Sequence, residues 1–364
     1  MLARIAQELF WLGRDLTRAE HTARMLDGAF HADVAGGATG PAGENNPHPG
    51  IALSWDGVLA VIGAKPPAPG LKPPVHDGGE TSIGLTETFR DTTGHAAAGT
   101  LGRHEIAPLL TLDTDSPASV VSCVCRARER ARTLLDVISA EMWEALNSFY
   151  LSLGRYDLQA ALATGPYSVY QEVKERCALF WGLLEKTMLR DEARSFLAAG
   201  GHLEEADMVL RMLRVADPAR GNSGEVEGSG ATPLEHESEA LALLQAVGGF
   251  QAFRRHHRRA PTLPDVSRFL LYESQYPGSV RASLEELRDA LITADEMPRF
   301  APPVLRLGRL IADLELHQRT ALESEPLVGQ LAGVQDELEI IDHEIDERYF
   351  AVAALASVHP SVRP

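Results

Sequence analysis

Acidic and basic side chains recur one helical turn apart at two places in this 364-residue sequence. Glu20 precedes Arg24 by four residues, and Asp207 precedes Arg211 by four. In a helix this order brings an acid and an arginine together on one face. Paired carboxylate and guanidinium groups suit a ligand that carries both an amino group and a carboxylate. The alternative is two solvated surface bridges, each contributing only about 0.3–0.5 kcal/mol.

Both pairs lie in segments that resemble each other. Residues 1–26, MLARIAQELFWLGRDLTRAEHTARML, and residues 188–213, MLRDEARSFLAAGGHLEEADMVLRML, are identical at nine of 26 positions when offset by 187. Apolar residues of the first segment recur at three- and four-residue steps, which predicts an amphipathic helix. They are Leu2, Ile5, Leu9, Leu12, Leu16, Ala19, Ala23 and Leu26. Since each copy of a helical repeat needs a neighbour to cover its apolar face, we expect the two helices to face one another.

A second match extends the repeat. Residues 104–120 match residues 264–280 at an offset of 160, and both stretches end in Pro-x-Ser-Val. We therefore predict an all-α helical bundle built from two tandem pseudo-symmetric repeats, residues 1–187 and 188–364, which form one compact unit. Pro/Gly-rich loop insertions interrupt the bundle, the largest at about residues 31–103. His31–Gly50 is predicted to be a loop, and Ala216–Thr232 a flexible connection.

A single long helix is expected from about residue 117 to about residue 150, with Ser116 as its N-cap. Arg128 and Arg132 lie one turn apart on it and could together hold an anionic ligand or the acids of a partner. The alternative is a solvated face neutralised by the chain's own acids. Glu141 lies further along the same helix as a candidate buried acid.

Composition and motifs weigh against several function classes. The net charge of −17, from 34 basic and 51 acidic residues, opposes sequence-independent phosphate binding, so no nucleic-acid partner is expected. No apolar run suits a membrane span and the N-terminus does not read as a secretory signal, so we expect a cytoplasmic protein. Three cysteines lack metal-ligand spacing and Glu-x-x-His is missing, so no metal site is predicted. The chain also lacks GxxxxGK, GxGxxG, HExxH and GxSxG motifs.

Three blocks of the sequence resemble the best-marked blocks of the bacterial alpha-E proteins. They are WLGRDLTRAEHTARMLD at residues 11–27, and residues 116–150 and 187–215. Alpha-E proteins are predicted to be all-helical and are named for a Glu-Arg pair inside the repeated helix. The pair is incomplete in both copies here. Thr17-Arg18 keeps only the arginine, and Glu204-Glu205 keeps only the first acid.

The resemblance also implies a function. Alpha-E proteins are encoded beside, or fused to, circularly permuted ATP-grasp ligases, often with a transglutaminase-like peptidase. It implies that this chain is the helical accessory component of an ATP-dependent amide- or peptide-forming system. ATP and magnesium would belong to the partner ligase, and this chain would bind no cofactor itself. In this hypothesis Arg18 and Glu205 meet across the pseudo-twofold axis, and the two acid–arginine pairs around them present an amino-acid or peptide substrate.

Two alternatives stay open at this point. One is a stand-alone enzyme of amide transfer that uses a buried acid among Glu20, Glu141 and Asp207 as general base. The other is a non-catalytic helical scaffold whose acidic surface recruits basic partners. The scaffold hypothesis predicts no pocket between the repeats.

Overall fold

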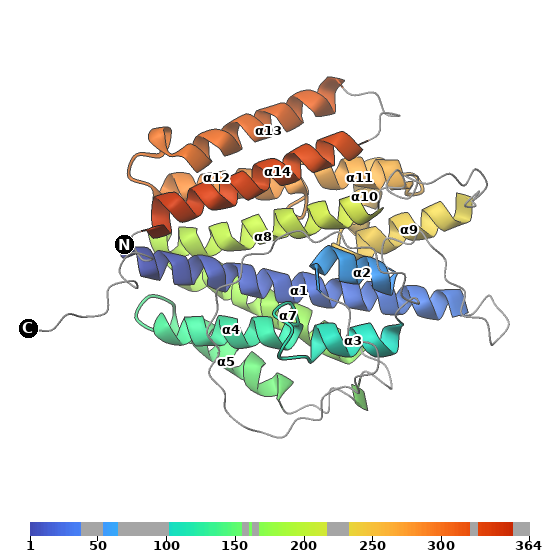
Figure 1. Ribbon diagram of the computed structural model, residues 1–364, viewed down its shortest axis with the longest axis horizontal. Helices are drawn as coiled ribbons and strands as arrows, with labels where there is room; N and C mark the ends of the chain where they lie inside the picture. The colour runs from blue at the N-terminus through green and yellow to red at the C-terminus, as the bar shows by residue number, and fades with distance from the viewer. Residues whose placement is uncertain are drawn as a thin grey trace, which may run out of the picture.

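The computed structural model describes residues 1–37, 54–64, 102–154, 160–161, 167–216, 233–320 and 327–351. Within these ranges every regular element is helical, which confirms the predicted all-α class (Figure 1). None of the helices described has both the length and the apolar character needed to cross a lipid bilayer. The division into two repeats at residue 187 stays a prediction.

Two long helices form the centre of the bundle. α1 (Ala3–Gly37) and α8 (Glu192–Ala216), the helices of the two similar segments, pack along each other. α4 (Val120–Thr133) packs against α1, and α12 (Val280–Ala294) packs against α8. Figure 1 shows α1 and α8 side by side through the middle of the molecule, with α4 and α12 on opposite sides of them.

The two central helices approach so closely that their backbones touch. A Cβ atom placed on Gly200 would lie 1.8 Å from the carbonyl oxygen of Phe10. One placed on Gly13 would lie 2.2 Å from the carbonyl oxygen of Leu197. Gly13 and Gly200 are also 187 residues apart, the offset of the sequence repeat. The crossing therefore requires glycine on both helices, because any other side chain would push the backbones apart.

The remaining helices surround this central pair. The first half contributes α2 (Trp55–Ile62), α3 (Arg103–Thr111), α5 (Ala140–Leu153) and α7 (Tyr167–Thr187). The second half contributes α9 (Pro233–Ala246), α10 (Phe250–His257), α11 (Leu263–Tyr272), a 3₁₀ turn η2 (Pro298–Phe300), α13 (Pro302–Thr320), α14 (Val328–Ile345) and a π-helical turn η3 (Asp346–Phe350). The halves interleave, since α2 packs on α8 and α9 packs on α1.

Buried apolar residues from both halves form one continuous core. The predicted stripe of α1 is buried from Leu9 to Leu26, whereas Leu2 at its start is 72% exposed. At the same end of the bundle the ring of Phe350 closes over Phe10 and Phe196, with centroids 5.4 and 6.1 Å apart. The two central helices thus share a single apolar interior.

The single helix predicted from about residue 117 to about residue 150 is wrong. α4 ends at Thr133, and α5 begins at Ala140 and packs against α4. The Ser139 hydroxyl accepts a hydrogen bond from the Met142 N–H and so caps a new helix. Leu134, in the break, is also buried, so the apolar periodicity runs through the break without marking it.

The N-cap predicted at Ser116 is also wrong. The Ser119 hydroxyl accepts a hydrogen bond from the Ser122 N–H at 3.1 Å and caps α4. The equivalent serine of the second half, Ser279, caps α12 in the same way. Both serines precede valine in the Pro-x-Ser-Val stretch, so the cap lies two residues after the proline.

α1 extends further than the sequence predicted. A loop was expected from His31, but the helix continues to Gly37, because the first proline of this stretch is Pro41. The remainder of that loop, most of the insertion at about residues 31–103, and the connection after Ala216 lie outside the described residues. The end of α1, all of α2 and the start of α3 are the parts of the expected insertion that the structure describes as helix.

Replacing Gly200 with alanine should destabilise the protein, because the new methyl group meets the Phe10 backbone. We expect the free energy of unfolding, measured by urea denaturation, to fall by about 1–3 kcal/mol or more. Gly308→Ala in α13 is the matched control, since a Cβ there meets nothing within 4 Å. Helix propensity should make that control neutral or stabilising by up to about 1 kcal/mol. Equal stability of the two variants would contradict a backbone crossing.

Candidate functional site

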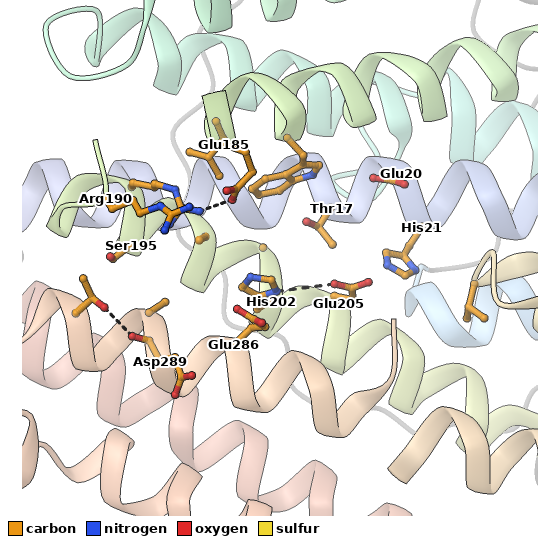
Figure 2. Close-up of a pocket in the computed structure, with 18 of the residues that line it drawn as sticks. Thr17, Glu20, His21, Glu185, Arg190, Ser195, His202, Glu205, Glu286 and Asp289 are labelled. Atoms are coloured by element: carbon orange, nitrogen blue, oxygen red, sulfur yellow. Dashed lines mark hydrogen bonds and ion pairs between the residues drawn. The ribbon is translucent and has the colours of Figure 1, made fainter. Parts of the chain in front are cut away.

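A pocket of about 470 Å³ lies beside the crossing of the two central helices. Its walls come from α1, α7, α8 and α12, together with Arg190 between α7 and α8 and Val247 after α9 (Figure 2). Trp181, Leu184 and Ala198 supply apolar surface. The charged residues of the wall are Glu20, Arg24, Glu185, Arg190, Arg194, Glu205, Glu286 and Asp289. The pocket therefore presents both signs of charge.

Helical spacing brings these groups to the pocket. On α1, Thr17, Glu20, His21 and Arg24 line the wall, and three- and four-residue steps place them on one face. On α8, Ala198, Gly201, His202 and Glu205 follow the same spacing. A Cβ atom on Gly201 would lie 2.6 Å from the ring of Trp181, so the indole packs directly on the α8 backbone and forms part of the wall.

Arg24 is held in place on the pocket wall. Its Nε and Nη2 donate to Oε1 of Glu20 at 3.0 and 2.7 Å, which confirms the ion pair predicted from the four-residue spacing. The guanidinium also lies against Gly248, whose φ is 73°, and a Cβ atom there would be 3.1 Å from Nη1. The side chain of Arg24 stays 28% exposed, so it remains accessible from the pocket.

Glu205 lies in the same pocket without a basic partner. No arginine or lysine in the described ranges comes within ion-pair distance of it, and its contact is with His202, whose Nδ1 is 4.0 Å from Oε2. Burial, followed by the charge of Glu20, raises the pKa of Glu205 to about 8, although Arg24 acts in the opposite direction. The carboxyl group is therefore mostly protonated at pH 7.

Both histidines of the pocket are neutral at pH 7. Burial lowers the pKa of His21 to about 4, and burial with the nearby charge of Arg194 lowers the pKa of His202 to about 4. His21 is only 6% exposed, and its Nδ1 has no hydrogen-bond partner in the part of the chain described. Leaving such a buried nitrogen unpaired is unfavourable, so it is suited to bind a ligand group.

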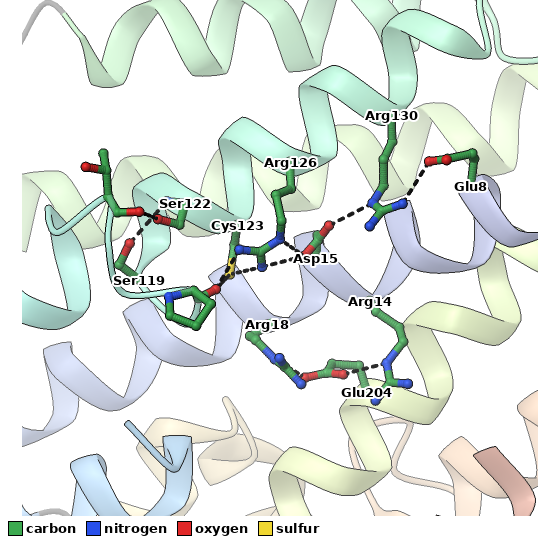
Figure 3. A network of polar contacts seen from close by, with 12 residues as sticks. Glu8, Arg14, Asp15, Arg18, Ser119, Ser122, Cys123, Arg126, Arg130 and Glu204 are labelled. Atoms are coloured by element: carbon green, nitrogen blue, oxygen red, sulfur yellow. Dashed lines mark hydrogen bonds and ion pairs between the residues drawn. The ribbon is translucent and has the colours of Figure 1, made fainter. Parts of the chain in front are cut away.

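Arg18 binds Glu204, the acid that precedes Glu205 on α8. Its Nε donates to Oε1 of Glu204 at 2.5 Å, and Nε of Arg14 donates to Oε2 at 2.9 Å (Figure 3). Nη1 of Arg14 also donates to Asp342 of α14 at 2.8 Å. Burial by itself would raise the pKa of Glu204, but Arg18 and Arg14 outweigh burial and lower it to about 2. This carboxylate therefore stays charged in the interior.

The predicted meeting of Arg18 with Glu205 is wrong. Successive residues of a helix point about 100° apart, so Glu204 and Glu205 cannot both face α1 at the same place. Glu204 faces Arg18 with no exposed side-chain surface, and Glu205 turns into the pocket, where its side chain is 28% exposed. The periodicity of the repeat could not tell which of two adjacent acids faces inward.

A second network of ion pairs, partly buried, joins α1 to α4. Nη2 of Arg126 donates to Oδ1 of Asp15 at 2.6 Å, and Arg130 reaches Asp15 at 3.2 Å and Glu8 at 2.8 Å (Figure 3). These four residues were not among the predicted site residues. A signal was available, because the two arginines are four residues apart and the two acids are seven apart, so each pair shares one face of its helix.

Arg128, Arg132 and Glu141 lie outside the pocket. Nε of Arg128 donates to Oδ1 of Asn147 at 2.8 Å and joins α4 to α5. The side chain of Arg132 is 62% exposed and lies 3.5 Å from Glu129. Glu141 is exposed in the first turn of α5, so the prediction of a buried acid there is wrong. A role for the two arginines in binding a partner stays a prediction.

Asp207 and Arg211 belong to a different and smaller pocket. Nη2 of Arg211 lies 2.9 Å from Oδ2 of Asp207, which confirms the second pair predicted from spacing. Gln335 of α14 donates to Oδ1 of the same aspartate at 2.8 Å. The space beside these residues measures about 60 Å³. Since Arg24 and Arg211 line separate pockets, the prediction of one site that contains both ion pairs is wrong.

A model of the Alpha-E family, described as a predicted alpha-helical domain with a conserved ER motif, matches residues 1–350. The chain belongs to the Alpha-E family. The same comparisons find no matching curated protein and no matching solved structure. In this Alpha-E chain Arg18 and Glu204, the residues that the sequence resemblance assigns to the motif, bind each other. Thr17 and Glu205, where the other halves would stand, both line the pocket.

Replacing Glu204 with glutamine should destabilise this Alpha-E chain, because Arg14 and Arg18 lose their shared buried carboxylate. We expect the free energy of unfolding at pH 7 to fall by about 3–5 kcal/mol. Because the folded-state pKa is depressed, this stabilisation is present above the ordinary value of 4.5 and is lost as the pH falls through about 2. Urea denaturation at several pH values should show the variant and wild type converging in acid.

The matched control for this experiment is Glu144→Gln, which changes an exposed acid of α5. It should alter the free energy of unfolding by less than about 0.5 kcal/mol at any pH. A gap between Glu204→Gln and wild type that stays constant from pH 7 to pH 2 would contradict the role assigned to the carboxylate.

Proposed function

We propose that this chain binds a small zwitterionic ligand, an amino acid or a short peptide, in the pocket between α1 and α8. The observation that carries the proposal is the distribution of charge along the pocket. Arg190 lies at one end, whereas Glu20 and Glu205 lie toward the other (Figure 2). Arg194, in the first turn of α8, pairs with Glu185 and adds a further arginine.

The size of the pocket supports this class of ligand. Small-molecule sites have volumes of roughly 300–1,000 Å³, combining apolar surface with a few charged groups. The pocket has about 470 Å³ and contacts Trp181 and Leu184 besides its charged residues. Arginine binds carboxylates with two parallel hydrogen bonds, and carboxylates bind ammonium groups. A ligand with one of each can therefore satisfy both ends.

We infer that the bound ligand is presented to a separate ligase of the circularly permuted ATP-grasp type. The similarity to Alpha-E proteins is the basis for this partner, and a transglutaminase-like peptidase is a second expected associate. In the proposal ATP and magnesium belong to the ligase, because this chain has no GxxxxGK phosphate loop. The cytoplasm is the proposed compartment, since Cys123, Cys125 and Cys177 are free thiols.

We also propose that the two halves descend from one duplicated helical module. The identities between residues 1–26 and 188–213 support this, as does the contact of Gly13 and Gly200 with the opposite helix. A second contact also runs both ways between the halves, because α2 packs on α8 and α9 packs on α1. Gly63 after α2 and Gly248 after α9 also share a positive φ, of 70° and 73°.

A non-catalytic scaffold is the less supported alternative. That hypothesis predicts no pocket between the repeats, whereas side chains of α1 and α8 line one of about 470 Å³. The scaffold hypothesis also rests on the acidic composition of the chain. Several of these acids form ion pairs with arginines of the chain itself, among them Glu204, Asp15 and Asp342.

Replacing Arg24 with alanine should reduce amide formation at least 10-fold when the chain is mixed with its ligase, ATP, magnesium and amino acids. The variant removes the guanidinium that fixes the Glu20 carboxylate on the pocket wall, so Glu20 is no longer held in position for the ligand. Amide product would be measured by mass spectrometry, and circular dichroism would verify the fold.

Arg211→Ala is the matched control for this experiment. It breaks the equivalent ion pair in the other half but lies in the smaller pocket, so the yield should stay near that of wild type. Equal yields from the two variants, or failure of the chain to co-purify with the ligase, would count heavily against the proposal.

A second candidate function is amide transfer by this chain alone. The observation that favours it is Glu205, whose pKa of about 8 lies near the pH at which a general base or acid works best. If the chain is such an enzyme, the purified protein should convert amino acids or peptide amides without the ligase, and Glu205→Gln should remove that turnover. An absence of product with and without ATP would exclude this candidate.

A further inference from the structure

Glu205 lines the pocket without a cation from the residues that the structure describes. Glu204 is bound by Arg14 and Arg18, and Glu20 is bound by Arg24. Glu205 instead faces His202 at 4.0 Å, and that ring is neutral at pH 7. A carboxylate in a partly closed site is unfavourable without a positive partner. The described residues supply no such partner when Glu205 is ionised, so an incoming ligand can provide it.

The groups near Glu205 offer acceptors for such a partner. Both hydrogen bonds from Arg24 go to Oε1 of Glu20, so Oε2 receives none from the residues described. His21, 6% exposed, has an Nδ1 atom without a partner in the described ranges. Figure 2 shows the ring of His21 at the same end of the pocket as Glu20 and Glu205. Together with Glu205 these make three acceptors.

We propose that this end of the pocket recognises a primary ammonium group of the ligand, the α-amino group of a short peptide. An ammonium group carries three N–H donors, which match the acceptors of Glu205, Glu20 and His21. The ligand thus supplies the positive charge that the second copy of the Glu-Arg motif lacks at position 205. This inference rests on the proposed function and specifies how its ligand is oriented.

The distance between the two ends of the pocket favours a peptide over a free amino acid. Eleven residues separate Arg194 from Glu205 on α8, which corresponds to about 16 Å along the helix axis. The arginine side chains shorten this span, and an extended peptide covers about 3.3–3.6 Å per residue. A peptide of about two to four residues can therefore place its amino group at Glu205 and its carboxylate near Arg190 or Arg194.

Binding of the ammonium group should release a proton near neutral pH. The ionisable groups that act on or contact Glu205 are Glu20 and Arg24 of α1, His202 of α8 and Tyr276 before α12. His21, Glu185 and Glu286 line the same pocket. In the free protein burial and Glu20 keep Glu205 mostly protonated at pH 7. An ammonium group favours the carboxylate, so the proton leaves as the ligand enters.

The test is calorimetric titration of the full chain with trialanine and with N-acetyl-trialanine at pH 7. We expect acetylation to weaken binding at least 10-fold, because it removes the ammonium charge. Titrations in buffers of different ionisation enthalpy should show release of nearly one proton per trialanine bound. Glu205→Gln, which resembles the protonated form in shape, should lose both effects. Glu141→Gln, at an exposed position of α5, is the matched control and should retain them.

The outcomes separate this inference from the proposed function. Equal affinity for both peptides, or an unchanged preference in Glu205→Gln, would overturn ammonium recognition at Glu205 and leave a ligand pocket in place. Failure of the wild-type chain to bind either peptide would overturn the proposed function together with the inference. Circular dichroism of each variant would exclude loss of the fold as the cause.

Discussion

The contact between the backbones of α1 and α8 at Gly13 and Gly200 sets the geometry of the rest of the molecule. With no side chain between them, the two helices lie close enough for the next polar residues to meet directly. Arg14 and Arg18 therefore reach Glu204 inside the interface, where water is largely excluded and the ion pairs are correspondingly strong. Wider spacing would leave these charges buried and unpaired, which is strongly unfavourable.

The buried charges hold the helices in one register. Two acids of the interior bind arginines of another helix, Glu204 of α8 those of α1 and Asp15 of α1 those of α4. Sliding a helix by one turn would separate several of these partners at once. Apolar packing alone tolerates such shifts better, because it is not directional. The polar network can thus specify which of many similar helix packings this chain adopts.

Adjacent residues at the two positions that resemble the Glu-Arg motif have different surroundings. Arg18 and Glu204 form a largely buried pair between α1 and α8. Thr17 and Glu205, the residues beside them, line the pocket. One pair lies inside the helix crossing, and in the proposed function the other position offers a carboxyl group to the ligand.

The sequence by itself determined the helical class, the contact of α1 with α8 and the two acid–arginine pairs at four-residue spacing. Each of these follows from a short-range period that repeats along one helix, which is why residues such as Glu20 and Arg24 could be paired in advance. Tertiary structure alone decided the break at Leu134, the choice of Glu204 over Glu205 as the partner of Arg18, and the separation of Arg24 from Arg211. Those features depend on how far apart helices from distant parts of the chain lie and on which face each one presents. Periodicity within a helix carries no information about either.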